Sequence, residues 1–193
     1  MTPMKIIPFI VVALAVVTTA GAQSADKLYK AGKELYDAKN YSAAFPKLQE
    51  AAAKGHKKAQ YRLGRCYDKG HGVAENDSLA FVWYLKSAEQ EYAKAQYQVG
   101  KSYKNGEGVA KDRQKAVAYF TLAAKQGNAD AQYQLAKAYL KGKGVKADKK
   151  QAAKWLTKAV QNEKGGDEVM RKMREDAAAG DETAAEMLRI VGK

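Results

Sequence analysis

The chain has 193 residues and is strongly basic: 34 Lys and Arg stand against 21 Asp and Glu, for a net charge of +13 and a pI near 9.6. Hydrophobic residues make up 46% of the chain, enough for a folded core, so the composition excludes a wholly disordered protein. A single cysteine, Cys66, excludes an internal disulfide framework and a zinc site built from several thiolates. With His56 and His71 as its two histidines, the chain has few residues for metal or general-base chemistry.

The first 22 residues have the three-part pattern of a secretory signal peptide. Lys5 supplies a positive charge, the apolar run Ile6–Val17 follows, and Ala20 and Ala22 are the small residues expected before a cleavage site. The run has 12 residues, fewer than the roughly 18 of a membrane span. We therefore predict cleavage after Ala22 and a periplasmic or secreted protein without a transmembrane span in the mature chain. An uncleaved anchor is the alternative, because no charge follows before Asp26.

Residues 23–54 carry the pattern of one pair of helices. Tyr29, Gly32 and Leu35 recur at helical spacing, and Leu48 lies on a second apolar face further along. Because no glycine-rich loop separates the two stretches, we expect a short connection between them.

Three units then repeat with a period of 36 residues, at 55–90, 91–126 and 127–162. Each unit begins with an amphipathic stripe that favours a helix, followed by a glycine loop and a second helical stripe. The recurring positions are Tyr61, Tyr97 and Tyr133; Tyr67, Tyr103 and Tyr139; Gly70, Gly106 and Gly142; Gly72, Gly108 and Gly144; and Ala80, Ala116 and Ala152.

The polar and glycine positions predict where the helices end and begin. Gly70 suits the left-handed residue that ends a helix, and Gly72 allows the chain to reverse. The second helix is expected to start at Asn76 and at its equivalents Asp112 and Asp148, whose side chains can cap it.

Three further repeat positions predict packing. Trp83, Tyr119 and Trp155 recur on the second helices and are predicted to be core residues. Cys66 aligns with Ser102 and Ala138, so we expect a small residue packed inside a helix. Glu91 stands where Gly55 and Gly127 stand in the other units, so the helix end there must form without a glycine.

After the third unit, residues 163–193 depart from the period at Gly165 and contain two more helical stretches separated by Gly180. Terminal segments of repeat proteins close the core with a polar outer face, so we interpret 163–193 as a C-terminal helical cap.

The run A-x-A-Q-Y-x-L-G-x-x-Y-x-x-G-x-G-V followed by D-x-x-x-A-x-x-Y-F resembles the Sel1-like repeat (SLR) family, a relative of tetratricopeptide repeats (TPR), over residues 55–162. The resemblance implies an all-α fold, an α/α solenoid of SLR/TPR-like helix pairs, with residues 23–54 as a TPR-like opening repeat. It also implies an interaction scaffold or adaptor without catalytic activity.

In arrays of this kind the first helices line a concave face that holds ligands. The resemblance places on that face a tyrosine and, four residues later, a base, two positions that share one side of a helix. The candidate partner-binding residues are Tyr29 and Lys33, Tyr61 and Arg65, Tyr97 and Lys101, and Tyr133 and Lys137. We predict that they bind a protein or extended peptide with an acidic surface. Packing of the tyrosines and a merely solvated lysine face are the alternative.

No catalytic residue, metal site or cofactor is predicted. The Gly-x-Gly loops lack the strand and the Gly-Lys-Ser/Thr of a phosphate-binding motif and are interpreted as turns. His71 is expected at an exposed loop tip and His56 in solvent. Because the chain is basic and predicted to be exported, we expect its partner to be an acidic protein, the cell wall or an anionic polysaccharide, and not nucleic acid. The resemblance to cysteine-rich members of the family implies a further alternative, an enzyme that binds or hydrolyses β-lactams. This chain lacks the paired cysteines of those members.

Overall fold

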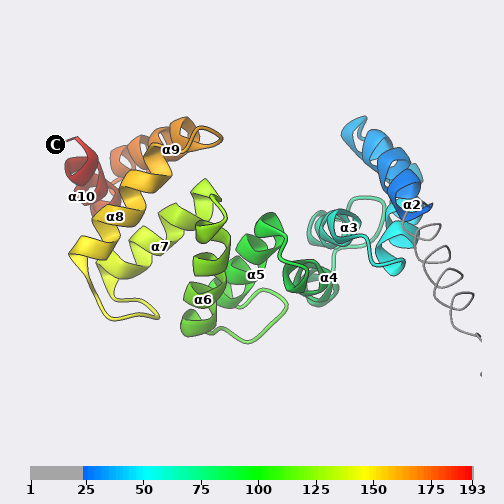
Figure 1. Ribbon diagram of the computed structural model, residues 1–193, viewed down its shortest axis with the longest axis horizontal. Helices are drawn as coiled ribbons and strands as arrows, with labels where there is room; N and C mark the ends of the chain where they lie inside the picture. The colour runs from blue at the N-terminus through cyan, green and yellow to red at the C-terminus, as the bar shows by residue number, and fades with distance from the viewer. Residues whose placement is uncertain (1–23, 193) are drawn as a thin grey trace, which may run out of the picture. The chain divides into compact units, whose positions relative to one another are not determined.

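The computed structural model describes residues 24–192, so the predicted signal peptide lies outside the described residues. Residues 24–37 form the first helix (Figure 1). The helices that follow are α2 (Tyr41–Ala53), α3 (Lys57–Lys69), α4 (Asp77–Glu89), α5 (Ala93–Asn105), α6 (Arg113–Lys125), α7 (Ala129–Lys141), α8 (Lys149–Val160), α9 (Gly166–Ala178) and α10 (Glu182–Val191). The described chain is therefore all-α and built from consecutive helix pairs, as the sequence predicts.

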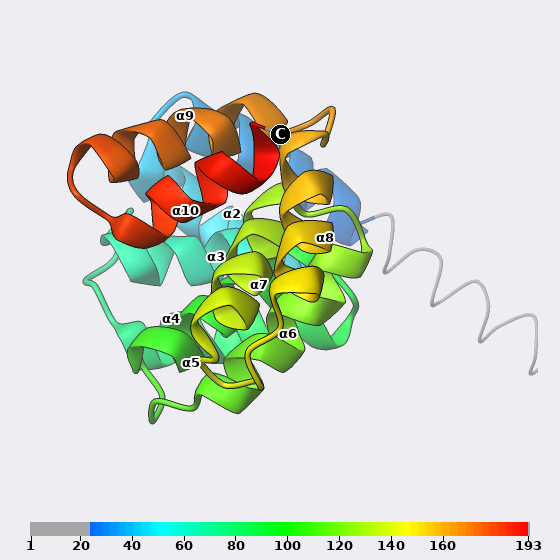
Figure 2. The same ribbon diagram turned by 90° about the vertical axis from the view of Figure 1, so that its left-hand side faces the viewer.

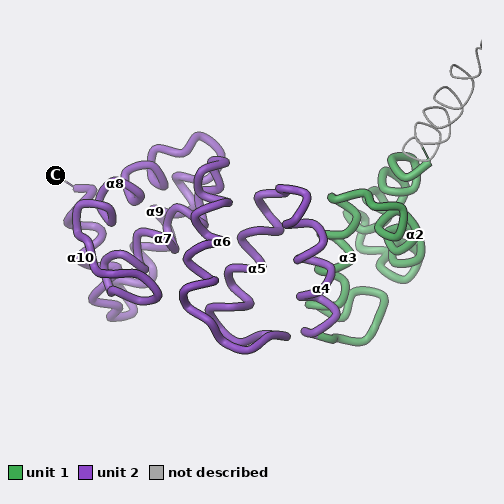
Figure 3. The backbone as a smooth tube through the Cα atoms, turned by 60° about the horizontal axis from the view of Figure 1, so that its bottom comes forward, with its two compact units in different colours: residues 1–76 green, residues 77–193 purple. Residues whose placement is uncertain are grey.

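By its backbone contacts the chain divides into two compact units, residues 1–76 and residues 77–193 (Figure 3). In unit 1, the helix at 24–37 and α2 are joined by the short connection 38–40, and α2 packs on α3. Leu48 and Cys66 are fully buried in the core of this unit, beside Tyr36. Cys66 is thus the packed helical residue that the repeat alignment predicts, and burial raises the pKa of its thiol to about 11.

In unit 2, each helix from α4 to α8 packs against the next one along the chain. The core between α6 and α7 consists of small and medium side chains, among them Ala124, Ala131 and Leu135, together with Phe120. Gly100 on α5 lies so close to the Phe120 ring that a Cβ would displace it. Small residues at these positions therefore allow the helices to approach closely, which the stacking of helix pairs requires.

The glycine loops have the predicted geometry. Gly70, Gly106 and Gly142 end their helices with φ values of 64°, 85° and 62°. The next helices of unit 2 begin with side-chain caps: Asp112 accepts the backbone N–H of Lys115, and Asp148 that of Gln151. The prediction that these loops are turns is confirmed by the backbone.

The second glycine of each loop has a role that the sequence does not reveal. A Cβ on Gly108 would overlap the carbonyl oxygen of Asp77 at the start of α4, and one on Gly144 would overlap that of Arg113 at the start of α6. Each loop thus rests its backbone on the second helix of the preceding repeat, and only glycine leaves room for this contact.

The core prediction for the second helices is wrong by one residue. Trp83, Tyr119 and Trp155 are half-buried, whereas the residues that follow them are buried: Tyr84, Phe120 and Leu156. Consecutive residues of a helix point in directions about 100° apart. Because both residues of each pair are apolar, the sequence alone does not show which of the two faces the core. Trp83 and Trp155 instead lie beneath the ammonium groups of Lys86 and Lys158, at 4.4 and 5.1 Å from the ring centroids.

The C-terminal helices α9 and α10, orange and red in Figure 2, pack on each other and on α8. Their buried Val169, Met173 and Met187 join Leu156 of α8 and Tyr133 of α7 in one cluster. Gly180 joins the two helices with a φ of 90°. The two predicted helical stretches of residues 163–193 are present, and they cover the last repeat.

Candidate functional site

Each predicted Tyr–base pair lies on the first helix of a helix pair, in the relation i, i+4. In unit 1, the Tyr29 ring stacks on the His56 ring at 4.3 Å between centroids. The Lys33 ammonium lies 2.6 Å from the Asp37 carboxylate. Tyr61 is half-buried, and the Arg65 guanidinium lies 5.6 Å from the centre of the Tyr36 ring. Intrachain contacts therefore already engage the first pair.

The two pairs of unit 2 differ in how open they are. On α5, Tyr97 is half-buried against Phe120, with 5.9 Å between ring centroids, and Lys101 is partly exposed. On α7, Tyr133 is only 1% exposed and belongs to the core cluster beneath the C-terminal helices. Tyr133 therefore offers no open ring surface, and partner binding by the eight residues stays a prediction.

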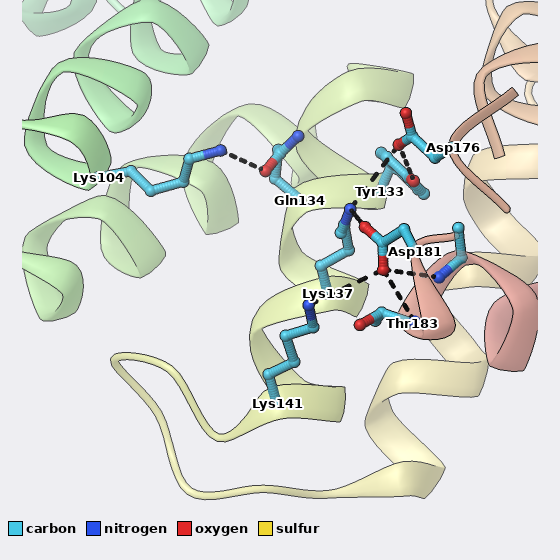
Figure 4. Close-up of polar contacts among 9 residues, drawn as sticks. Lys104, Tyr133, Gln134, Lys137, Lys141, Asp176, Asp181 and Thr183 are labelled. Atoms are coloured by element: carbon cyan, nitrogen blue, oxygen red, sulfur yellow. Dashed lines mark hydrogen bonds and ion pairs between the residues drawn. The ribbon is translucent and has the colours of Figure 1, made fainter. Parts of the chain in front are cut away.

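The pair on α7 holds two carboxylates of the chain itself (Figure 4). The Tyr133 hydroxyl donates to Asp176 at 3.4 Å, and the Lys137 ammonium lies 3.8 Å from the same carboxylate. Lys137 also donates to Asp181 at 3.1 Å, and the Lys141 ammonium lies 4.0 Å from Asp181. A tyrosine and a lysine four residues apart thus bind carboxylates together.

Asp181 is held from two sides. Its carboxylate accepts the backbone N–H groups of Thr183 and Ala184 and so caps α10. Burial by itself raises the pKa of this carboxyl, but the hydrogen bond from Lys137 and those from the two backbone amides outweigh it and hold the pKa below its ordinary value. For Tyr133, burial and the neighbouring Asp176 both raise the pKa of the phenol.

A pocket of about 420 Å³ opens beside this cluster, entirely within unit 2. Its lining contains seven cationic side chains and no carboxylate, and its apolar wall comes from α6 and α7. The cations are Lys104, Lys111, Arg113, Lys137, Lys141, Lys143 and Lys172, and the apolar residues are Ala116, Val117, Phe120 and Ala138. We call this site the basic pocket.

Lys104 shows how crowded the positive charge is. Its ammonium donates to the side-chain oxygen of Gln134 at 3.0 Å (Figure 4). Burial lowers the pKa of Lys104, and the charges of Lys137, Lys101 and Lys172 lower it further, against a smaller opposing effect of Glu107. An anion bound in the pocket would therefore relieve repulsion that the folded chain leaves in place.

Sequence reasoning found only part of this pocket. Lys137 is one of the predicted partner-binding residues, and Lys104 and Lys141 are further bases on the first helices α5 and α7. Lys111, Arg113 and Lys172 come from a loop, from the start of α6 and from α9, and no common spacing connects them. Their only signal is the excess of lysine in the whole chain, which does not say where the side chains meet.

The two histidines are less exposed than the sequence predicts. His56 caps α3: its Nδ1 accepts the backbone N–H of Ala59 at 3.0 Å, and burial lowers its pKa. His71 stacks on Tyr41 at 3.8 Å and shares a 2.9 Å hydrogen bond with the Tyr36 hydroxyl. Both rings are half-buried structural residues rather than solvated ones.

The glutamine of the repeated Ala-Gln-Tyr motif is also structural. Gln60, Gln96 and Gln132 are buried, and each donates to a carbonyl eight residues earlier, at 3.3, 3.4 and 3.1 Å. These carbonyls belong to the ends of the preceding helices, where each also accepts the backbone N–H of the residue three positions later, so the glutamine supplies an additional donor. The motif therefore encodes the junction between one pair and the next.

Within residues 24–192, no group of three or more His, Cys, Asp and Glu side chains is placed to hold a metal ion. In the same part of the chain, no helix combines the length and apolar character needed to cross a membrane.

Consecutive helix pairs of similar length, glycine loops and a Gln-bonded junction define an α/α repeat protein. Three consecutive segments, residues 57–92, 93–128 and 129–163, match the Sel1 repeat and together cover more than half of the chain. The chain therefore belongs to the Sel1 repeat family, and it is a Sel1 repeat scaffold protein with the SLR fold.

Solved structures of bacterial Sel1 repeat proteins resemble the chain. One, from Oxalobacter formigenes, is 36% identical with a TM-score of 0.70, over 74% of this chain and 56% of that one. Another, a protective antigen present in uropathogenic Escherichia coli strains, is 29% identical with a TM-score of 0.72, over 89% of this chain and 38% of that one. The chain thus spans about half, or less, of the length of these proteins. Among curated proteins, none matches it.

Proposed function

We propose that the protein is an exported, non-catalytic interaction scaffold that binds an acidic partner through the basic, tyrosine-bearing faces of its first helices. The observation that carries this proposal is the pair on α7, where Tyr133 and Lys137 together hold the carboxylate of Asp176. The same residue types in the same spacing stand at Tyr97 and Lys101 on α5, where Lys101 has no ion pair within the described residues.

Export is the part of the proposal that rests on the sequence. The three-part pattern of residues 1–22 supports it, and so does a net charge suited to the anionic surfaces of a cell envelope. Mass spectrometry of the native protein checks it: an N-terminus at Gln23 is the expected result, and a retained Met1 overturns export by a cleaved signal.

The test of partner binding is a quantitative pull-down from envelope extract. The mature protein is compared with the double variant Arg65→Glu and Lys101→Glu, which leaves Lys137 in place because Lys137 holds the C-terminal helices. The control variant, Lys125→Glu and Lys154→Glu, changes the net charge equally at two exposed positions outside the basic pocket.

We expect an acidic protein that the unmodified chain and the control enrich and the double variant loses, with all three folded by circular dichroism. Equal enrichment by the two variants would mean that the partner binds to another surface.

The absence of nitrocefin turnover is the expected result for a scaffold, and measurable turnover would overturn the non-catalytic assignment.

A cell-wall or anionic polysaccharide ligand is the second candidate, favoured by the seven cations of the basic pocket. Sedimentation with purified peptidoglycan tests it. Binding that is lost in about 0.5 M salt supports an electrostatic polysaccharide contact, because the Debye length then falls to a few ångström.

A further inference from the structure

We propose that the basic pocket binds an extended acidic peptide segment of a partner protein, with one apolar side chain inserted between flanking carboxylates. This inference deepens the proposed function and rests on it, since it names the ligand that one part of the scaffold takes. The pocket lies wholly within unit 2, between α5, α6, α7 and α9.

The first support is uncompensated charge. Lys137 and Lys141 face Asp176 and Asp181, but within the described residues Lys104, Lys111 and Lys172 have no carboxylate at ion-pair distance. These three come from α5, from the loop after it and from α9, so they surround the opening instead of following one helix. Carboxylates from an outside chain fit such a ring.

The second support is the apolar wall. Val117 of α6 is half-buried at the pocket, next to Phe120 and Ala116, and Ala138 of α7 adds a methyl group. A volume of about 420 Å³ holds more than one small ion and suits a side chain with its neighbouring peptide groups. Inorganic phosphate alone would leave this wall uncovered.

The third support is the chemistry of the groups already bound there. At the edge of the pocket, Asp176 and Asp181 occupy Lys137, and both are carboxylates carried on short side chains (Figure 4). The chain thus contains its own example of the contact proposed for the partner. Lysine ammonium groups dominate the ring, and each can donate to a carboxylate oxygen as Lys137 donates to Asp181.

The experiment measures fluorescence anisotropy of labelled ten-residue peptides against the full mature protein at about 0.1 M salt. The probe alternates Glu and Leu. One matched peptide replaces every Glu by Gln and so removes the charge, and a second replaces every Leu by Ser and so removes the apolar side chains. Saturable binding of the Glu/Leu peptide, with both matched peptides at least tenfold weaker, is the expected result.

The site is tested with a triple variant, Lys104→Gln, Lys111→Gln and Lys172→Gln. Its matched control, Lys125→Gln, Lys150→Gln and Lys154→Gln, removes the same charge from exposed positions outside the pocket. We expect the pocket variant to weaken the Glu/Leu peptide at least tenfold and the control less than twofold.

A third variant, Val117→Asn, tests the apolar wall. We expect it to weaken the Glu/Leu peptide and to leave the weaker Glu/Ser binding unchanged. Thermal unfolding by circular dichroism shows whether each variant is folded, and the triple variants alter no residue of the core clusters.

Two outcomes overturn the proposal. If the pocket and control triple variants weaken peptide binding equally, the peptide responds to diffuse charge and not to the pocket. If inorganic polyphosphate displaces the labelled peptide at a lower concentration than unlabelled peptide does, the pocket is a phosphate site. The peptide assay and the pull-down fail independently. If the peptide does not bind, the pocket proposal is wrong, but a protein captured in the pull-down still supports the proposed function. If the peptide binds and no envelope protein is captured, the pocket proposal is supported and the proposed function is not.

Discussion

Asp181 makes two stabilising contacts, and two different substitutions at this position can separate their contributions. It caps α10 through the backbone amides of Thr183 and Ala184, and it pairs with Lys137 of α7. Asparagine is as good a capping residue as aspartate but carries no charge. The residue therefore allows the cap and the ion pair to be measured one at a time.

We expect Asp181→Asn to lower the free energy of unfolding by about 1 kcal/mol at pH 7, since a partly exposed ion pair is lost while the cap remains. Asp181→Ala loses both contacts and is expected to cost about 2 kcal/mol. Urea unfolding at pH 7 measures both changes. Equal losses for the two variants would mean that the cap contributes nothing, and no loss for Asp181→Asn would mean that the ion pair contributes nothing.

The same comparison has a defined pH dependence. The folded protein holds the pKa of Asp181 below its ordinary value, so the ion pair stabilises the fold fully above the unfolded value of about 3.9. The contribution is then lost progressively as the pH falls towards the folded pKa. We expect the difference in stability between the wild type and Asp181→Asn to begin to narrow as the pH falls below about 4 and to vanish only at the lower, folded pKa. A difference that stays constant as the pH falls below about 4 would contradict this assignment.

At the scale of the helical element, the junction between α4 and α5 is formed with a strained residue. Glu91 has a φ of 59°, in the left-handed region that Gly127 occupies at the equivalent position with a φ of 80°. A Cβ at Gly127 would meet no atom within 4 Å, so any effect of adding one there comes from the backbone alone.

We expect Glu91→Gly to raise the free energy of unfolding by about 0.5 to 1 kcal/mol, because relief of the left-handed strain exceeds the added freedom of the unfolded chain. Gly127→Ala is expected to lower it by about 1 kcal/mol. Denaturant unfolding checks both. Glu91→Ala, which removes the charge and keeps the strain, is the control, and a gain from it equal to that of glycine would assign the effect to charge.

At the scale of the whole molecule, the last repeat and the C-terminal helices share one core. Leu156 of α8 is fully buried with Met173 of α9 and Met187 of α10, whereas Trp155 is only partly buried at the edge of the cluster. The fully buried side chain is therefore the smaller of the two neighbours, although Trp155 packs against the core cluster between α6 and α7 as well.

We expect Leu156→Ala to cost about 3 kcal/mol, within the range of buried leucine truncations, and Trp155→Ala to cost less than Leu156→Ala despite its larger side chain. Urea unfolding of the two variants gives the comparison. A larger loss for Trp155→Ala would show that the sequence-based core assignment was correct after all.

The sequence by itself determined the helix pairs, their 36-residue period, their glycine loops and their caps. These features depend on contacts within a few residues, such as the φ of Gly106 or the bond from Asp112 to Lys115. The repetition of one pattern in three units also reveals the family, because each unit encodes the same junction to its neighbour.

Only the tertiary structure decided which face of each second helix is buried and where the charges meet. The choice between Trp155 and Leu156, like that between Tyr119 and Phe120, depends on a rotation of one residue, which the packing of each helix on its neighbours sets. Likewise, Lys137 meets Asp181 across 44 residues of chain, and the basic pocket combines bases from α5, α6, α7 and α9. Such contacts follow from how helices pack in space, and the spacing of residues along one helix carries no record of them.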